Sequence, residues 1–327
     1  ACTVEAEGDG RGIDTEGGGE ISYRTPEFFR NKLLIGGSMD FINVQNQHMM
    51  STVDDNTIRQ DGVFISDEIR LTPVILTAGM RVDFHPSVPN GKVSYRGSAA
   101  YLWKTNVIRA SVGSSFRMPT FSEMGARFYN ESAAGDDLIV LEGNPDLAPP
   151  EILSVELAYQ GTIADRLELA PSIFYNHLSN LIYQDFEPVI GKSYANLGER
   201  DVIGVELGAT YIPINSLRLN LSYTFQHFID PPEDAFNTIG YPDANPAHIL
   251  NLGIQGFLVD NRLVLSLSGL LRSNAQYMLQ AGIPPQILSH ETGVTLVLTP
   301  RVSWDIVPEK IDVFLTGPIR IPGGYQE

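Results

Sequence analysis

The 327-residue chain lacks several features that would point to common classes of protein. Its single cysteine, Cys2, excludes an internal disulfide framework and a cysteine-rich metal site. No run of about 18 apolar residues occurs, which excludes a transmembrane helix. Lys and Arg number 22 against 39 Asp and Glu. The resulting net charge of −17 argues against a nucleic-acid partner, because phosphate contacts need a basic surface.

Signals of enzyme chemistry are also scarce. No Ser/His/Asp spacing, phosphate-binding loop or metal-ligand cluster stands out, so we expect no enzymatic activity, no cofactor and no resident metal. The six histidines fall in expected loops or at adjoining strand ends. The middle of a membrane-spanning strand excludes histidine, so this distribution is expected of a barrel. We favour this explanation over haem or metal ligation by the histidines. Residues 1–20 are acidic and glycine-rich without a signal peptide, so we expect a loop or a truncated start there.

What the chain does have is a regular alternation of apolar and polar residues. From Leu217 to Phe225 the odd positions are Leu, Leu, Leu, Tyr and Phe, and the even ones are Arg, Asn, Ser and Thr. A period of two indicates β-strands, and helical spacing fits none of these segments. The pattern predicts thirteen strands, with a weaker fourteenth at 21–24: 33–43, 58–71, 74–84, 93–103, 106–117, 151–162, 166–177, 201–213, 216–228, 247–259, 262–273, 291–307 and 310–316.

The connections between these strands alternate between short and long. Short turns are expected at 71–74, 104–106, 164–166, 213–216, 260–262 and 308–310. Long loops are expected at 43–57, 85–92, 117–150, 178–201, 228–247 and 274–290. In a β-barrel that crosses the outer membrane, short turns face the periplasm and long loops face outside. The rhythm therefore predicts a membrane protein of the all-β class.

The polar side of the strands carries charge at mid-strand. Lipid outside and a wet lumen inside explain one apolar and one charged face on every strand better than a sandwich of two sheets does. We therefore expect an antiparallel up-and-down transmembrane β-barrel, with these charged residues facing the lumen: Arg81, Arg96, Arg109, Glu156 and Arg218. No closing strand follows 310–316, so we expect an incomplete barrel, because an open edge in lipid leaves backbone groups unpaired.

The most specific motif lies between Val107 and Glu156. It reads RASVGSSFRMPTFSE over 109–123 and GNPDLAP over 143–149, and a later hairpin carries ANLG at 195–198 and IGVE at 203–206. Pro119 must end the preceding strand, since it lacks an N–H. For Arg117 and Glu156 two readings stay open: they pair inside the barrel with each other or with a plug domain, or they anchor the base of the loop.

These runs closely resemble the signatures of TonB-dependent outer-membrane receptors, over roughly residues 30–316. The residues that match the family motifs are Phe116, Arg117, Pro119, Glu123, Asn144, Pro145, Leu147, Gly204 and Glu206. The resemblance implies a barrel of twenty-two strands, of which we expect about 13–14 here. It also implies an N-terminal plug and a TonB-contact segment. We find neither, so we expect a fragment: barrel residues at 21–317 and a truncated extracellular loop at 318–327.

The resemblance further implies energised uptake of a scarce nutrient across the Gram-negative outer membrane. The expected partners are outer-membrane lipid, the TonB complex through the plug, and a ferric siderophore or similar small ligand. Haem is less favoured, because 120–143 contains no histidine. Candidate ligand contacts in the loops are Arg127, Tyr129, Tyr183, Tyr194 and His227. Two alternatives are a passive porin or adhesin barrel, and a soluble β-rich binding module.

Overall fold

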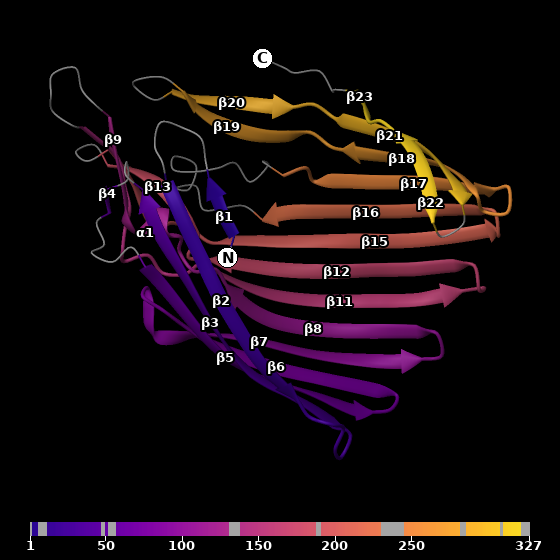
Figure 1. The fold of residues 1–327 in the computed structure, drawn as a ribbon, viewed down its shortest axis with the longest axis horizontal. Coiled ribbons are helices and arrows are strands. Elements are labelled where there is room, and N and C mark those ends of the chain that lie inside the picture. The colour runs from indigo at the N-terminus through magenta and orange to yellow at the C-terminus, as the bar shows by residue number, and fades with distance from the viewer. Residues whose placement is uncertain are drawn as a thin grey trace.

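The structure is a computed structural model, and it describes residues 2–5, 12–46, 50–51, 57–130, 138–187, 191–229, 245–281, 286–307 and 310–321. One long, curved antiparallel sheet dominates it (Figure 1). The described residues contain one short helix, α1 (Phe121–Gly125). No described helix has the length and apolar character needed to cross a membrane.

The large sheet has sixteen strands, and nearly all of them pair with their neighbours in chain order. In order across the sheet they are β1 (Cys2–Glu5), β2 (Gly12–Arg24), β3 (Asn31–Asn46), β5 (Thr57–Leu71), β6 (Val74–His85), β7 (Val88–Trp103), β8 (Asn106–Phe116), β11 (Glu151–Ile163), β12 (Leu167–Ser179), β15 (Arg200–Ile214), β16 (Leu217–Ile229), β17 (His248–Leu258), β18 (Leu263–Arg272), β21 (Thr295–Val307) and β22 (Ile311–Thr316). A last strand, β23 (Ile319–Ile321), also pairs with β21.

All fourteen predicted strands are present, so the prediction of an incomplete, antiparallel up-and-down barrel is confirmed. The weakest of them, at 21–24, is the end of β2, which begins at Gly12. Part of the expected loop at 1–20 therefore lies in the sheet. The glycine-rich, acidic composition of 12–20 hides the alternation there, because Gly17, Gly18 and Gly19 carry no side chain. Likewise β23 lies within the expected loop at 318–327.

The prediction of a long loop at 85–92 is wrong. β6 runs to His85 and β7 starts at Val88, so the connection is a tight turn. Pro86 lies in this turn, and Pro89 and Gly91 lie in an irregularity of the β6–β7 pairing, between the partners Asp83↔Lys92 and His85↔Val88. Gly91 has a φ of +82°, which a β-bulge can use and which favours glycine.

The pairing register separates an apolar face from a polar one. Leu157, Ile173 and Val205 are direct partners on three neighbouring strands, and they are 48%, 53% and 42% exposed. Only four hydrophobic residues in the described part of the chain are buried: Met124, Leu147, Val202 and Ala275. A soluble module would bury such apolar rows in a core. Here the curved sheet presents them outward, as contact with lipid requires.

Three of the expected long loops contain regular structure. They contribute strands to a separate five-stranded sheet: β4 (Met50–Ser51), β9 (Ala126–Asn130), β10 (Leu138–Glu142), β13 (Ile182–Glu187) and β14 (Gly191–Asn196). A fourth loop forms the hairpin of β19 (Ala275–Ala281) and β20 (Gln286–Thr292). β4, β9 and β13 lie at the end of the large sheet opposite the tight turns (Figure 1). We call the five-stranded unit the extracellular sheet.

Candidate functional site: the loop base and the inner wall

The segment 117–150 leaves the large sheet and returns to it at one place. Phe116 ends β8 and pairs with Glu151, which starts β11. The Arg117 backbone N–H donates to the Pro150 carbonyl at 3.0 Å, which extends the ladder by one more bond. Both halves of the sequence motif therefore meet at the rim of the wall, where we find a compact loop base.

Arg117 and Glu123 form an ion pair, which is the first tie (side-chain interaction) that holds this loop base together. The two guanidinium nitrogens of Arg117 donate to the two carboxylate oxygens of Glu123 at 2.7 and 2.8 Å. Such bidentate pairing is the strongest geometry for an ion pair. Thr120 precedes α1 and exchanges hydrogen bonds with Glu123: its N–H donates to the carboxylate at 2.7 Å, and its hydroxyl accepts from the Glu123 N–H at 3.3 Å. This is a capping box.

The pKa of Glu123 follows from these contacts. Burial raises it, but the hydrogen bonds from Arg117 and Thr120 outweigh burial, and the pKa lies below its ordinary value. A carboxylate with a lowered pKa stabilises the folded state above its unfolded pKa, about 4.3, and this contribution is lost as the pH falls through the folded pKa.

We therefore expect hydrogen exchange at residues 117–125 to be insensitive to pH from neutrality to about 4.3, and to accelerate below that value. Hydrogen-exchange mass spectrometry, corrected for intrinsic exchange, measures this. In the control Glu123→Gln the acid transition should disappear and protection should already be reduced at neutral pH. Unchanged protection of the wild type at pH values well below its folded pKa would contradict the role of this ion pair.

Asn144 and Leu147 hold the second half of the motif. The Asn144 N–H donates to the Glu123 carbonyl at 2.8 Å, so it contacts the helix that carries the first tie. The Asn144 side-chain oxygen accepts from the Asp146 N–H at 2.9 Å, which forms the turn that Asn144-Pro145 predicts. The Asn144 amide also donates to the Tyr194 carbonyl at 2.9 Å. Leu147 is only 2% exposed.

Asn196 is the residue that sequence reasoning missed as a site residue. Its side-chain oxygen accepts from the Ala148 N–H at 2.7 Å, and its amide donates to the carbonyls of Ala148 and Asn180, each at 2.8 Å. It thus ties the segment 117–150 to the segment 178–201. The pairing of β10 with β14 joins the same two segments. The ANLG motif contained Asn196, and a Thr-x-x-Glu spacing before an apolar residue could have predicted α1.

The inner face of the wall carries the predicted lumen-facing charges. Nε of Arg81 donates to both oxygens of Asp83 at 2.8 and 2.9 Å, and the far guanidinium nitrogen reaches the Ser38 hydroxyl at 2.7 Å. Asp83 is 3% exposed. A Cβ on Gly62 would stand 2.1 Å from the Arg81 guanidinium, so the ion pair lies directly on the glycine backbone.

Three further arginines differ in their surroundings. Arg109 on β8 donates to Glu156 on β11 at 2.7 Å. Arg96 has no ion pair or hydrogen bond from its side chain to any residue in the described ranges, and it lines a hollow of about 520 Å³ with Ser94, Ser111 and Ser154. The Arg218 guanidinium lies 5.7 Å from the centre of the Phe257 ring, which is cation–π distance.

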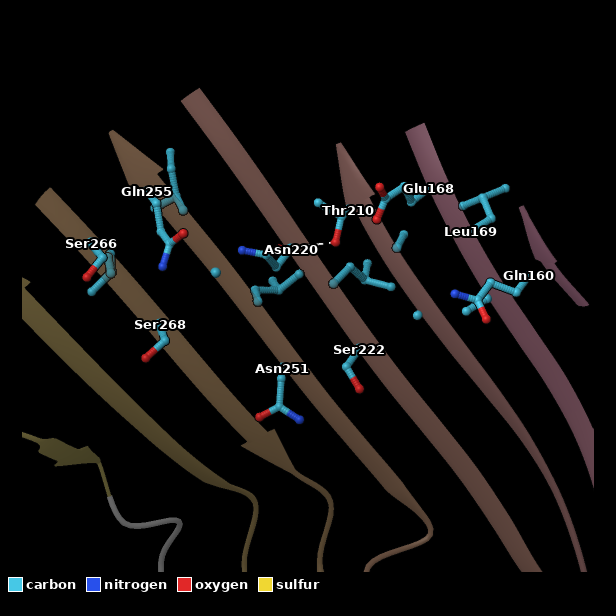
Figure 2. A pocket seen from close by; sticks show the side chains of 18 residues that line it. Gln160, Glu168, Leu169, Thr210, Asn220, Ser222, Asn251, Gln255, Ser266 and Ser268 are labelled. Atoms are coloured by element: carbon cyan, nitrogen blue, oxygen red, sulfur yellow. Dashed lines mark hydrogen bonds between the residues drawn. The ribbon is translucent and has the colours of Figure 1, made fainter. Parts of the chain in front are cut away.

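A second hollow lies farther along the sheet and contains almost no charge. Its volume is about 490 Å³, and the strands from β11 to β18 line it (Figure 2). Glu168 is the single ionisable residue of its lining. Its polar residues otherwise carry amides or hydroxyls: Gln160, Thr210, Asn220, Ser222, Asn251, Gln255, Ser266 and Ser268.

The structure decides part of the open question about Arg117 and Glu156. Arg117 pairs with Glu123 and Glu156 pairs with Arg109, so they do not pair with each other. Arg117 anchors the loop base, because the acidic partner in its own loop is only six residues away. Glu206 pairs with Ser172 and Thr224 in the ladder, on the inner face.

The ligand-loop candidates divide into three groups. Arg127 and Tyr129 lie on β9 and pair with Glu142 and Ile139, but their side chains fall outside what the structure describes. Tyr183 and Tyr194 lie on neighbouring strands of the extracellular sheet. His227 is the direct partner of Ile203, so the alternation places it on the outer, apolar face. That face lies away from the lumen, and ligand contact by His227 stays a prediction.

Comparison with known proteins agrees with the architecture of a curved barrel wall. The model of the TonB dependent receptor-like β-barrel family matches residues 8–285. The chain belongs to this family. The family resides in the outer membrane of Gram-negative bacteria and is a transporter family, not an enzyme family. No group of three or more His, Cys, Asp or Glu that could hold a metal occurs among the residues described.

Individual relatives share the fold at low sequence identity. The ferric enterobactin receptor PfeA of Pseudomonas aeruginosa superposes with a TM-score of 0.70 at 15% identity, covering 91% of this chain and 47% of that chain. The ferripyoverdine receptor of P. aeruginosa gives a TM-score of 0.69 at 15% identity, with 94% and 44% covered. The vitamin B12 transporter BtuB of Vibrio vulnificus is 27% identical over 121 residues, which is 37% of this chain and 17% of that protein. The chain spans less than half the length of these proteins.

Proposed function

We propose that this chain is part of a receptor that takes up a scarce nutrient through the outer membrane, with energy supplied by the TonB complex. The loop base carries this proposal. It ties Arg117, Glu123, Asn144 and Asn196 into one network at the rim of a polar inner wall. We propose that this network holds the loops in the arrangement that binds a ligand before transport.

A ferric siderophore is the ligand class that we favour. The solved structures that superpose on this chain include a receptor in complex with enterobactin and one bound to ferripyoverdine. Arg127, Tyr129, Tyr183 and Tyr194 belong to the extracellular sheet, and we propose that their side chains contact the ligand. Cationic and phenolic groups suit the negatively charged or aromatic groups of such a ligand.

Cobalamin is a second candidate ligand. The observation that favours it is the sequence match to a vitamin B12 transporter over 121 residues. In either case we propose that a plug gates the barrel and contacts TonB. We also propose that residues 21–317 form the core of the barrel portion, with lipid around its apolar outer face.

Uptake in cells tests this function. The complete gene product is expressed in a strain without its own receptors, and uptake of radiolabelled ferric siderophores and cyanocobalamin is measured with and without TonB. We expect TonB-dependent uptake of a siderophore. Uptake that is independent of TonB would support a passive pore, and an absence of uptake and binding of either ligand class would overturn the proposal.

The loop base supplies a variant for the same experiment. Asn196→Ala removes three hydrogen bonds, each worth about 1 kcal/mol. We expect roughly tenfold weaker ligand binding at the cell surface. Part of the lost hydrogen-bond free energy lowers the population of the loop arrangement that binds the ligand. Asn215→Ala, in the turn at the opposite end of the wall, should bind like wild type. Equal affinity of Asn196→Ala and wild type would exclude the loop base from ligand binding.

A further inference from the structure

The outer face of the wall carries an acidic residue far from the extracellular ends of the strands. The register sets Asp67 of β5 opposite Leu33 of β3 and Ala78 of β6, so its side chain belongs to the apolar, lipid-facing side. Asp67 lies near the end of β5, where a short periplasmic turn follows Leu71. Among the side chains of the large sheet that the structure describes, the other titratable residues on this face, tyrosines apart, lie at the extracellular ends of strands: Arg59, Asp61, Glu151, His177, Asp201, His227 and His248.

The carboxylate of Asp67 has an unsatisfied oxygen. Its Oδ1 atom is buried and has no hydrogen-bond partner among the residues described. Lys32 and Arg70, at adjacent ladder positions, belong to ion pairs of their own. A buried polar atom without a partner calls for an explanation, and a charge that faces the bilayer marks a candidate functional site. The neighbours of Asp67 on the outer face of β3 and β6 are apolar: Leu33, Ile35, Leu76, Ala78 and Met80.

A hollow of about 690 Å³ lies on the same outer face, beginning two strands away. Its floor is formed by small residues of β7 and β8: Gly97, Ala99 and Ala110. A Cβ on Gly97 would meet only Cγ1 of Val112, at 3.9 Å, so packing within the wall does not require this glycine. The hollow is therefore open space that faces the membrane. Larger apolar residues of β11 and β12 line its far side: Val155, Leu157, Ile173 and Tyr175.

Ala78 connects the carboxylate to the hollow. Asp67, Ala78 and Gly97 are successive partners across β5, β6 and β7, which lie side by side (Figure 1). Neighbouring strands are about 4.8 Å apart, so the Cα atoms of Asp67 and Gly97 are roughly 10 Å apart. Because Ala78 carries only a methyl group, no large side chain stands between the carboxylate and the hollow.

The row of partners that contains Asp67 climbs across the membrane. It continues from Gly97 through Val112 and Val155 to Tyr175. Asp67 lies close to the periplasmic end of β5, whereas Tyr175 lies far along β12 from its periplasmic start. The strand tilt of about 35–45° in such barrels causes this climb. The carboxylate therefore lies towards the head groups of the inner leaflet, and the hollow lies in the hydrocarbon.

We propose that Asp67, Ala78 and the hollow bind an aminophospholipid of the inner leaflet, with its ammonium group at Asp67 and an acyl chain in the hollow. A primary ammonium group offers three N–H donors, and its charge compensates the carboxylate. Asp67 is only half-buried, so a donor from the membrane can reach it. The apolar lining of the hollow matches an acyl chain. This lipid site goes beyond the proposed uptake function and depends neither on a transported ligand nor on TonB.

Lipid binding by the complete, purified receptor tests the head-group contact. The receptor in detergent is mixed with phosphatidylethanolamine, phosphatidylcholine or phosphatidylglycerol of identical acyl chains, and native mass spectrometry measures the bound lipid. We expect phosphatidylethanolamine to bind about tenfold more tightly than the other two. The quaternary ammonium of phosphatidylcholine has no N–H donor, and the head group of phosphatidylglycerol has no cation. Equal affinity for the three lipids would overturn the proposal.

Asp67→Asn removes the charge at nearly constant size. We expect this variant to bind phosphatidylethanolamine about tenfold more weakly and to lose the preference among head groups. Asp61→Asn is the matched control, because Asp61 lies on the outer face of the same strand but pairs with Arg59 at the extracellular end. It should bind like wild type. Wild-type affinity and preference in Asp67→Asn would exclude the carboxylate from lipid binding and overturn the proposal.

Gly97→Leu fills the hollow and tests the acyl-chain contact. We expect about tenfold weaker binding of all three lipids. Gly256→Leu, on the outer face of β17, should bind like wild type. Heat-modifiable migration on gels verifies folding, and Ala110→Leu fills the same hollow if Gly97→Leu does not fold. Unchanged lipid binding by a folded, filled variant would overturn the proposal. So would a wild-type dimer without bound lipid that Gly97→Leu disperses, because the hollow would then hold a second copy of the chain.

Discussion

Replacing Arg81 by alanine is expected to lower the free energy of unfolding by about 3–5 kcal/mol, because it leaves the carboxylate of Asp83 buried without its cation. Asp83 is 3% exposed, and both of its oxygens accept from Arg81. The Ser38 hydroxyl loses its partner as well. Urea unfolding of the complete protein in detergent, followed by tryptophan fluorescence, measures the loss.

Arg96→Ala is the matched control for this prediction. Arg96 lies on the same inner wall but has no ion pair or side-chain hydrogen bond to the residues described, so its removal should change stability by no more than about 0.5 kcal/mol. The double variant Arg81→Met with Asp83→Leu should lose less than Arg81→Ala, since no charge is left unpaired. Equal losses for Arg81→Ala and Arg96→Ala would contradict the importance of the ion pair.

Gly204→Ala is expected to destabilise the wall by about 1–3 kcal/mol through overpacking. Gly204 is the glycine of the IGVE motif and pairs with Phe174. A Cβ at this position would lie 2.2 Å from Cζ of Phe174 and 2.7 Å from the Phe225 carbonyl oxygen. The ring can move, but the carbonyl belongs to the β-ladder and cannot move without disturbing it. The same unfolding measurement applies.

Gly208 provides the control within the same strand and on the same face. A Cβ there would meet Ala170 at 3.5 Å, an ordinary contact, so Gly208→Ala should be close to neutral. Phe174→Leu combined with Gly204→Ala should restore part of the stability, because only the contact with the Phe225 carbonyl would remain. A neutral Gly204→Ala would show that the backbone can shift at no cost and would remove the physical reason for glycine in this motif.

The strand assignment could be predicted because it depends on local alternation. Each strand must present an apolar face to lipid, and segments such as 217–225 therefore alternate with a period of two. Strand prediction is less accurate where this alternation is weak. The glycine-rich stretch 12–20 and the bulge at Gly91 carry little or no alternating signal, and there the structure differed from the expectation.

The loops were harder to predict for the same reason. No lipid-facing side constrains the strands of the extracellular sheet, so β9, β10, β13 and β14 show no regular alternation that length and composition would reveal. Their pairing joins segments about fifty residues apart, as Leu141 with Lys192 shows. Asn196 became recognisable as a tie between loops only when the fold brought it to Ala148.

The sequence by itself determined the class of the protein: a run of alternating strands, with short turns at one end and long loops at the other, and a motif that places it among TonB-dependent receptors. Only the tertiary structure decided which charges meet, that three loops build one sheet, and that polar residues of strands β11 to β18 line a hollow on the inner wall. The physical reason is the sequence separation of the residues involved. Alternation is a pattern of adjacent residues, whereas ion pairs, contacts between loops and hollows form between residues that the curvature and register of the sheet bring together.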